Sequence, residues 1–196
     1  MTDFLELPAG PLADTILATV RASESPSVAN HSIRSFLFAR MVAEQEGSVR
    51  DAAYDEDLLF AACVLHDLAL GPLGAGKARF EVEGADLAAP VLTAHGVPAA
   101  DADRVWEAIA LHSTVGIADR RGLLTYLTHK GVFTDAGRFA ELGAERLRQV
   151  YAAYPRPADA TFIRDAIIEH ATRSAAAAPP FSMGAELLRQ QRAEAA

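Results

Sequence analysis

The stretch DEDLLFAACVLHDLAL, residues 55–70, decides the fold class. Residues 58–65 are all apolar, acidic residues precede them, and the ionisable pair His66-Asp67 follows. A helix that is apolar on every side is buried in the middle of a fold, because no face of it can be left in water. We therefore expect a central helix that starts at Asp55 or Glu56 and ends at His66-Asp67.

Helical periodicity also dominates the rest of the chain, and few runs are rich in Val, Ile and Thr. Stretches rich in Pro, Gly and Ser, such as 23–28 and 71–76, separate the periodic segments and are typical of turns and loops. Asn30 is expected to cap the second helix. The expected helices cover 11–22, 31–46, 80–95, 101–112, 123–129 and 161–176, with a further segment from 134 or 135 to before Pro155. The pattern predicts an all-α, single-domain bundle over 1–178, with a C-terminal helix or tail at 179–196.

Composition narrows the class of protein further. Of 196 residues, 51% are apolar and 22% charged, which is typical of a globular chain and excludes disorder throughout. The net charge of −8 disfavours a nucleic-acid partner. The single cysteine, Cys63, excludes an internal disulfide framework and fits a reducing compartment.

Localisation follows from what the sequence does not contain. No run reaches the roughly 18 consecutive apolar residues that a membrane span needs. The segment up to Pro11 carries Asp3 and Glu6 and no basic region, so it does not resemble a signal peptide. We expect a cytoplasmic protein with a small-molecule substrate and no membrane partner. The sequence does not fix the oligomeric state, but a homo-oligomer is possible because the final helix offers Leu187 and Leu188 to a partner.

The His66-Asp67 pair is the sharpest chemical feature of the chain. Burying two ionisable groups costs several kcal/mol unless something compensates them. A divalent cation does so, since imidazole nitrogen and carboxylate oxygen are ligands of zinc, iron and manganese. The alternative is that Asp67 caps a neighbouring element or pairs with Arg34 or Arg79. Residue types alone leave both interpretations open.

Three motifs in order strengthen the metal interpretation: NHSIRSFLFA (30–39), AACVLHDLAL (61–70) and VFTDAGRF (132–139). They resemble the HD superfamily of metal-dependent hydrolases, helical domains named for their His-Asp pair. Four further stretches are similar to the cyanamide hydratase branch: LELPAGPLADTILA (5–18), RFEVEGADLA (79–88), AHGVP (94–98) and VWEAIALHS (105–113). The resemblance covers about residues 5–139. It implies an HD-type helical bundle with the metal ligands His31, His66, Asp67 and Asp135.

The last ligand is the weakest part of this match. Asp119 competes with Asp135, which we prefer because it follows Val132-Phe133 and precedes Ala-Gly, as the family's last aspartate tends to. The residue after HDL is Ala69, where the family often has glycine.

Other polar residues are candidates for the same site. His95 and His112 are expected to face the substrate or to complete a second metal site, and either could donate a proton. Lys130 is a candidate contact for an anionic substrate. Arg34, one turn after His31, is expected to orient Asp67 or Asp135. Glu83 and Asp86 are expected to be ordinary surface carboxylates, whereas His129 and His170 are assigned to structure or surface.

The resemblance implies an enzyme that activates water on a divalent metal, Zn or Fe first and Mn second. Its substrate would be a small polar molecule, such as a cyanamide- or nitrile-like compound that is hydrated. Three alternatives stay open: a phosphohydrolase on the same site, a di-iron oxygenase with His95 and His112 as ligands, and a non-catalytic HD module that binds without turnover. Asp67 is expected to assist catalysis as well as to bind metal.

Overall fold

The computed structural model describes residues 4–138, 142–159 and 161–195. All of the regular structure in these ranges is helical, with no strand, which confirms the all-α prediction. The α-helices are α1 (Pro11–Ser23), α2 (Pro26–Glu46), α3 (Glu56–Leu65), α4 (Phe80–Ala94), α5 (Ala99–Leu111), α6 (Leu123–Asp135), α7 (Ala144–Ala153), α8 (Phe162–Ala171) and α9 (Met183–Glu194). Three short 3-10 turns join them: η1 (Ser48–Arg50), η2 (Leu68–Leu70) and η3 (Ala118–Arg120).

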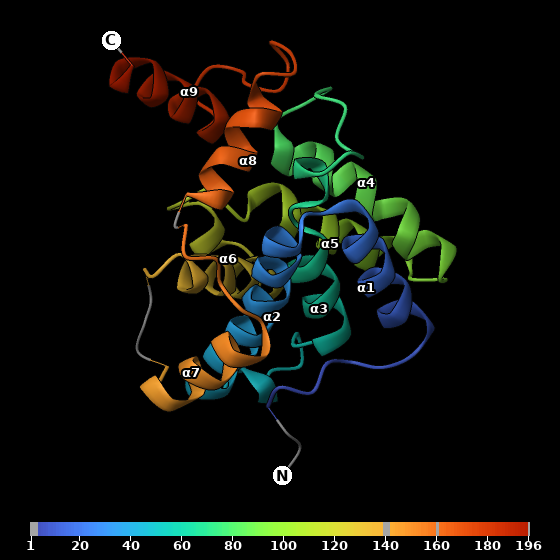
Figure 1. Cartoon of the computed structure of the whole chain (residues 1–196). Helices are drawn as coiled ribbons and strands as arrows, with labels where there is room; N and C mark the ends of the chain where they lie inside the picture. The colour runs from blue at the N-terminus through green and yellow to red at the C-terminus, as the bar shows by residue number, and fades with distance from the viewer. Residues whose placement is uncertain (1–3, 139–141, 160, 196) are drawn as a thin grey trace.

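Helix α3 is the central helix that its composition predicts. All eight of its residues from Leu58 to Leu65 are buried. It packs on α1, α2, α5 and α6, and Figure 1 shows it enclosed by them. The Asp55 side chain accepts a hydrogen bond from the backbone N–H of Leu58, which caps the first turn. The buried rod therefore delivers His66-Asp67 to the interior of the molecule.

Helices α2 and α6 make the most extensive helix pair in the described chain. Gly131 lies at their contact, where a Cβ would stand 2.1 Å from the Ser35 carbonyl oxygen and 2.8 Å from the Ala39 Cβ. Without that side chain the two backbones approach closely. This approach brings His31, in the second turn of α2, beside Asp135 at the end of α6.

The second helix begins earlier than the sequence analysis predicts. Residues 23–28 were expected to form a turn, but α2 starts at Pro26 with Ser25 as its cap, whose side chain accepts from the N–H of Val28. Proline suits the first helical position because its missing N–H would have no partner there. Asn30 is therefore inside the helix, and its side chain donates to the Pro155 carbonyl instead of capping.

Helix α6 also differs from the prediction. It does not end at His129 but continues to Asp135, and the next helix, α7, begins only at Ala144. Gly131 does not break α6 because its missing side chain is used in the contact with α2. The helix ends where Gly137 takes a φ of 82°, a conformation that glycine adopts without strain.

The C-terminal segment forms helices α8 and α9, which pack on each other at the upper edge of the molecule in Figure 1. Ser182 caps α9 by accepting a hydrogen bond from the N–H of Ala185. The expected helix or tail at 179–196 is thus helical over Met183–Glu194, whereas a domain boundary at 178 stays a prediction. None of the described helices is both long enough and apolar enough to cross a membrane.

Candidate metal centre

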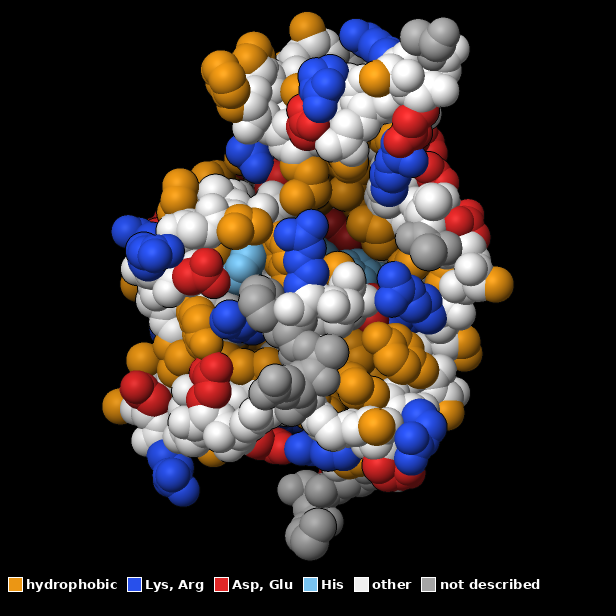
Figure 2. All heavy atoms as spheres, turned by 90° about the vertical axis from the view of Figure 1, so that its left-hand side faces the viewer, with side chains coloured by type: hydrophobic (Ala, Val, Ile, Leu, Met, Phe, Trp, Pro, Cys, Tyr) orange, Lys and Arg blue, Asp and Glu red, His pale blue; other side chains and the backbone are white. Residues whose placement is uncertain are grey.

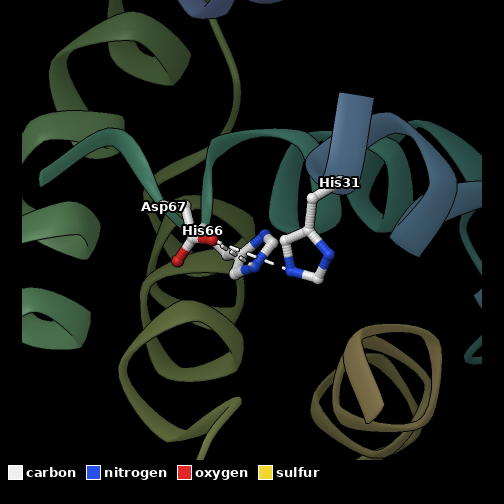
Figure 3. A group of neighbouring side chains, drawn as sticks. All are labelled: His31, His66 and Asp67. Atoms are coloured by element: carbon white, nitrogen blue, oxygen red, sulfur yellow. Dashed lines mark ion pairs between the residues drawn. The ribbon is translucent and has the colours of Figure 1, made fainter. Parts of the chain in front are cut away.

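The His66-Asp67 pair lies where α3 ends and the chain turns into η2. Both side chains are buried, and Asp67 is only 2% exposed. His31 reaches the pair from α2, and the three side chains converge in Figure 3. The Asp67 Oδ2 atom lies 3.2 Å from His66 Nε2 and 3.8 Å from His31 Nε2. One ligand atom from each residue lies within 4.8 Å of the other two, the one such group in the described part of the chain.

The donor atoms of this cluster fit a divalent cation. His66 donates its Nδ1 hydrogen to the Cys63 carbonyl at 2.7 Å, which leaves the Nε2 lone pair facing Asp67. Neither His66 Nε2 nor Asp67 Oδ2 has a hydrogen-bond partner among the described residues, although both are buried. Unpaired buried polar atoms are costly, and a cation between an imidazole nitrogen and a carboxylate oxygen satisfies both.

The arginine alternative for Asp67 does not hold in the structure. Arg34 forms its ion pair with Asp135, and Arg79 forms its own with Glu81. Burial raises the pKa of Asp67, but the neighbouring histidines His66, His31 and His112 outweigh it and place the pKa at about 2. The Asp67 carboxyl is therefore an anion, with imidazoles as its neighbours.

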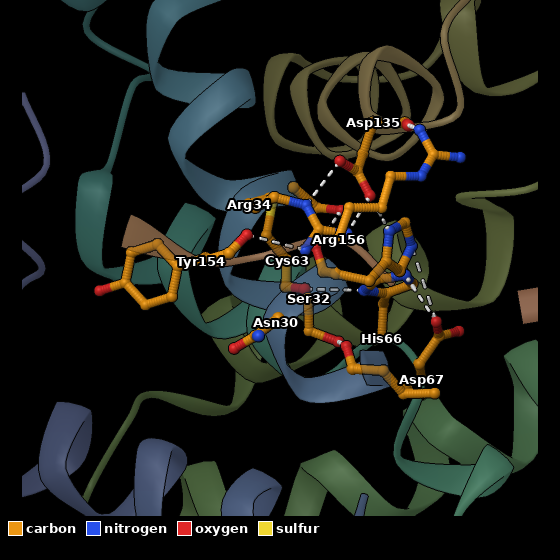
Figure 4. A network of polar contacts seen from close by, with 12 residues as sticks. Asn30, Ser32, Arg34, Cys63, His66, Asp67, Asp135, Tyr154 and Arg156 are labelled. Atoms are coloured by element: carbon orange, nitrogen blue, oxygen red, sulfur yellow. Dashed lines mark hydrogen bonds and ion pairs between the residues drawn. The ribbon is translucent and has the colours of Figure 1, made fainter. Parts of the chain in front are cut away.

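Asp135 lies on the far side of the His31 imidazole from Asp67. Its Oδ2 accepts the Nδ1 hydrogen of His31 at 2.6 Å, and Arg34 donates to both oxygens, at 2.7 and 2.8 Å. Figure 4 shows this network, with Arg156 donating to the Asp135 carbonyl oxygen. Burial raises the pKa of Asp135, but Arg34 and His31 lower it by more, so that it lies well below its usual range.

This arrangement gives Asp135 a role as a positioning residue. A carboxylate that accepts the Nδ1 hydrogen of a histidine fixes its tautomer and turns Nε2 toward a metal. Arg34 holds that carboxylate in place, as the sequence suggests. Direct ligation by Asp135 stays a prediction, because both of its oxygens are used by His31 and Arg34 in this structure.

His112 completes the polar floor of the site. Its ring lies 4.7 Å from the His66 ring, centre to centre, and it is 2% exposed. Its Nδ1 donates to the Ile109 carbonyl at 2.6 Å, so the Nε2 lone pair is the free acceptor of the ring. Burial, together with the neighbouring His66, lowers the His112 pKa to about 4. His112 is therefore neutral at pH 7, and as a proton donor it would first have to be protonated.

Three of the candidates lie elsewhere. His95 is exposed at the end of α4, where its Nε2 contacts the Thr15 hydroxyl at 3.0 Å and its Nδ1 donates to the Val91 carbonyl. The direction of α4 carries that end away from the cluster, so the structure corrects the prediction for His95. Lys130 lies over the Tyr126 ring, 5.3 Å from its centre, and does not line the cavity among the described residues. Asp119 faces His129 at 3.4 Å, which leaves Asp135 as the aspartate near the cluster.

Two glutamates of α4 are buried and hydrogen-bonded, although the sequence does not predict it. Glu83, expected on the surface, is buried and accepts from the N–H groups of Ala75 and Gly76 and from His170 Nε2 at 2.8 Å. Glu81 is fully buried; Arg79 pairs with it, and the hydroxyl of Ser113, next to His112, donates to it. Both residues lie in the stretch RFEVEGADLA (79–88) that carries the resemblance, but only the three-dimensional packing shows which carboxylates of this helix turn inward.

A cavity of about 530 Å³ opens onto the cluster. Its floor includes His31, His66, Asp67, His112 and Asp135, and α8 and α9 contribute much of its apolar wall. Three arginines also line it, Arg138, Arg156 and Arg164. On the face shown in Figure 2, His and acidic side chains are visible in a hollow beside Lys or Arg side chains.

The comparisons with known proteins agree with this geometry. A protein-family model described as HD domain matches residues 28–141, which is more than half of the chain. No curated protein sequence matches the chain. The matched segment contains every residue of the polar floor, from His31 to Asp135, and ends before α8 and α9.

Proposed function

Because the chain belongs to the HD domain family, we propose that it is a metal-dependent hydrolase whose divalent cation is held by His31, His66 and Asp67. The observation that carries this proposal is the pair of buried, unpartnered atoms, His66 Nε2 and Asp67 Oδ2, 3.2 Å apart. Two histidines and one carboxylate are a ligand set of catalytic zinc sites, which leave a position open for water or substrate. Zn, Fe and Mn all accept these ligands.

A divalent cation in this place supplies Lewis acidity and lowers the pKa of water toward about 7. The protein's own groups would do the rest. Asp135 and Arg34 keep the His31 Nε2 atom turned toward Asp67. His112, neutral at pH 7, offers its Nε2 as a hydrogen-bond acceptor that could orient a water or take its proton. Apolar side chains of α8 and α9 line the cavity beside these groups.

Two substrate classes follow from this chemistry. Hydration of a cyanamide- or nitrile-like group is the class that the resemblance of the sequence implies. Hydrolysis of a phosphate ester is favoured by Arg138, Arg156 and Arg164, which line the same cavity and could stabilise charge on phosphoryl oxygens. The di-iron alternative requires both His95 and His112 as ligands, and the contact of His95 Nε2 with the Thr15 hydroxyl speaks against it.

Metal content tests the proposal. We expect the full chain, purified without chelator, to bind a divalent metal at the cluster, and Asp67→Ala to lose it while its circular dichroism stays helical. Asp57→Ala is the matched control, since Asp57 lies on the same helix but is exposed. Release of urea from cyanamide and of phosphate from p-nitrophenyl phosphate then separates the two substrate classes. Full metal content in Asp67→Ala would overturn the proposal.

A further inference from the structure

One wall of the cavity is apolar and comes from outside the segment that matches the HD family. Helix α8 contributes Phe162, Ile163 and Ile167, and α9 contributes Met183 and Leu187. The polar residues that these helices add to the lining are Arg164, Glu186 and Gln190. The family match ends at residue 141, before either helix begins. The polar floor therefore lies within the matched segment, whereas this wall comes from residues that follow it.

Resting on the metal site proposed above, we propose that this wall binds an apolar body of the substrate. The substrate is then an organic molecule with an aromatic or branched hydrocarbon part attached to its reacting group, and not a molecule of cyanamide size. Helices α8 and α9 determine this specificity.

The wall begins directly at the cluster. The Phe162 ring lies edge-on to the His31 ring, with 6.3 Å between their centres. Phe80 belongs to the same apolar cluster as Ile167, and its ring lies 5.5 Å from the His112 ring. An aromatic or branched group packed against the Phe162 ring would be held next to the reacting group, because aromatic edges and faces pack at such separations.

The size of the cavity supports a larger substrate. Its volume is about 530 Å³, within the range of roughly 300–1,000 Å³ that holds drug-sized ligands. Cyanamide has three heavy atoms and fills about the space of three waters, roughly 90 Å³ at about 30 Å³ each. Most of the cavity would then stay filled with water against apolar side chains.

The wall is also only partly covered by the protein itself. Ile163, Met183 and Leu187 pack against a small apolar cluster that contains Ile167, yet all three stay partly exposed toward the cavity. Apolar side chains around a polar floor are typical of small-molecule sites, where they supply affinity and the polar groups supply orientation. Binding of a hydrocarbon body would remove their remaining surface from water.

Two hydroxamates test the inference without knowledge of the substrate. Acetohydroxamate and 1-naphthohydroxamate carry the same metal-binding group, and only the second carries an apolar body. By calorimetry on the Zn²⁺-loaded full chain, we expect 1-naphthohydroxamate to bind at least about thirtyfold more tightly, because its rings leave water.

Matched variants test whether the apolar wall causes the difference in affinity between the two hydroxamates. Leu187→Ala and Phe162→Ala should each weaken 1-naphthohydroxamate about fivefold or more and leave acetohydroxamate within about twofold. Leu188→Ala and Phe181→Ala are the controls, because neither residue lines this cavity in the described chain and Phe181 is fully exposed. Both controls should bind like the wild type.

The outcomes separate the two proposals. If acetohydroxamate binds but 1-naphthohydroxamate binds no more tightly, or if the wall variants behave like their controls, the apolar wall is not a substrate site and the metal proposal stands. If the chain takes up no metal and neither compound binds, the proposed function fails, and this inference fails with it.

Discussion

His31 lies between the buried Arg34–Asp135 ion pair and the Asp67 carboxylate. Its Nδ1 donates to Asp135 and its Nε2 faces Asp67, so one imidazole joins two carboxylates on opposite sides. Arg34 neutralises the outer carboxylate, and a cation would neutralise the inner one. The charges of the site are then balanced in pairs, which is what burial of so many ionisable groups requires.

Asp135→Asn tests this division of roles. The variant loses the Arg34 ion pair and no longer fixes the His31 tautomer, so we expect divalent-metal affinity to fall about 10- to 100-fold without being abolished. The change should also lower the free energy of unfolding by roughly 3 kcal/mol, because Arg34 is left buried with a weaker partner. Metal titration by calorimetry and urea unfolding measure the two effects.

Asp119→Asn is the control for this variant. Asp119 contacts His129 and not the cluster, so the metal affinity of the Asp119→Asn variant should equal that of the wild type. An equal loss in both variants, or a loss only in Asp119→Asn, would contradict the assignment of Asp135.

Glu81→Gln gives a pH-dependent prediction. Burial raises the Glu81 pKa, but hydrogen bonds from Arg79 and Ser113 and the nearby charges lower it below its ordinary value of 4.5. A folded-state pKa below the unfolded one stabilises the protein above about pH 4.5, and that stabilisation is lost as the pH falls through the folded value. We expect Glu81→Gln to cost about 2 kcal/mol at pH 7, and the difference from the wild type to shrink between pH 5 and pH 3.

Urea unfolding of both proteins over this pH range measures the difference. Asp101→Asn, which removes an exposed ion pair with Arg104, should change stability by less than about 1 kcal/mol. A Glu81→Gln difference that stays constant down to pH 3 would show that the charge of Glu81 does not stabilise the fold.

At the scale of helices, the contact between α2 and α6 sets the geometry of the site. Gly131→Ala would place a Cβ 2.1 Å from the Ser35 carbonyl oxygen and force the helices apart. We expect a loss of roughly 2 kcal/mol or more in the free energy of unfolding, even though alanine favours helix. Weaker metal binding should accompany it, because His31 and Asp135 lie on these two helices.

Gly122→Ala is the control at the other end of α6. A Cβ there has no described atom within 4 Å, so its cost should stay below about 1 kcal/mol. Equal unfolding free energies for the two variants would show that the close approach at Gly131 is not required.

The sequence predicts some elements better than others, for physical reasons. An unbroken apolar run is stable only in the protein interior, so the burial of α3 and the position of His66-Asp67 at its end follow from composition. The start of α2 follows from a local signal, Ser25 as the cap and Pro26 at the first helical position, which the sequence analysis missed. The continuation of α6 depends on the close contact of Gly131 with α2, which no local pattern contains. The sequence analysis predicts His95 at the site, but only the three-dimensional structure shows that the end of α4 lies beside Thr15 instead.

At the scale of the whole molecule, the motifs predict the polar floor and not the wall. His31, His66, Asp67 and Asp135 come from three segments of the family match, and the structure brings them together. Helices α8 and α9 carry no motif, because apolar residues of many kinds can line a cavity. Their position beside the metal site depends on the packing of the entire chain.

Metal binding should stabilise the whole fold, since its ligands come from distant segments. At a free concentration of 100 times the dissociation constant, Zn²⁺ or Mn²⁺ adds about 2.7 kcal/mol to the free energy of unfolding. For a chain of this length that raises the melting temperature by roughly 5–10 °C. Differential scanning calorimetry should show this rise for the wild type and none for Asp67→Ala; an equal rise in both would place the stabilising metal elsewhere.

Anomalous X-ray diffraction from crystals grown with Zn²⁺, with data collected on both sides of the zinc absorption edge, tests the central claim most directly. The account predicts an anomalous peak about 2.0–2.2 Å from His31 Nε2, His66 Nε2 and a carboxylate oxygen of Asp67. A zinc ion bound only at other residues, with His66 Nε2 and Asp67 Oδ2 left uncoordinated, would contradict it.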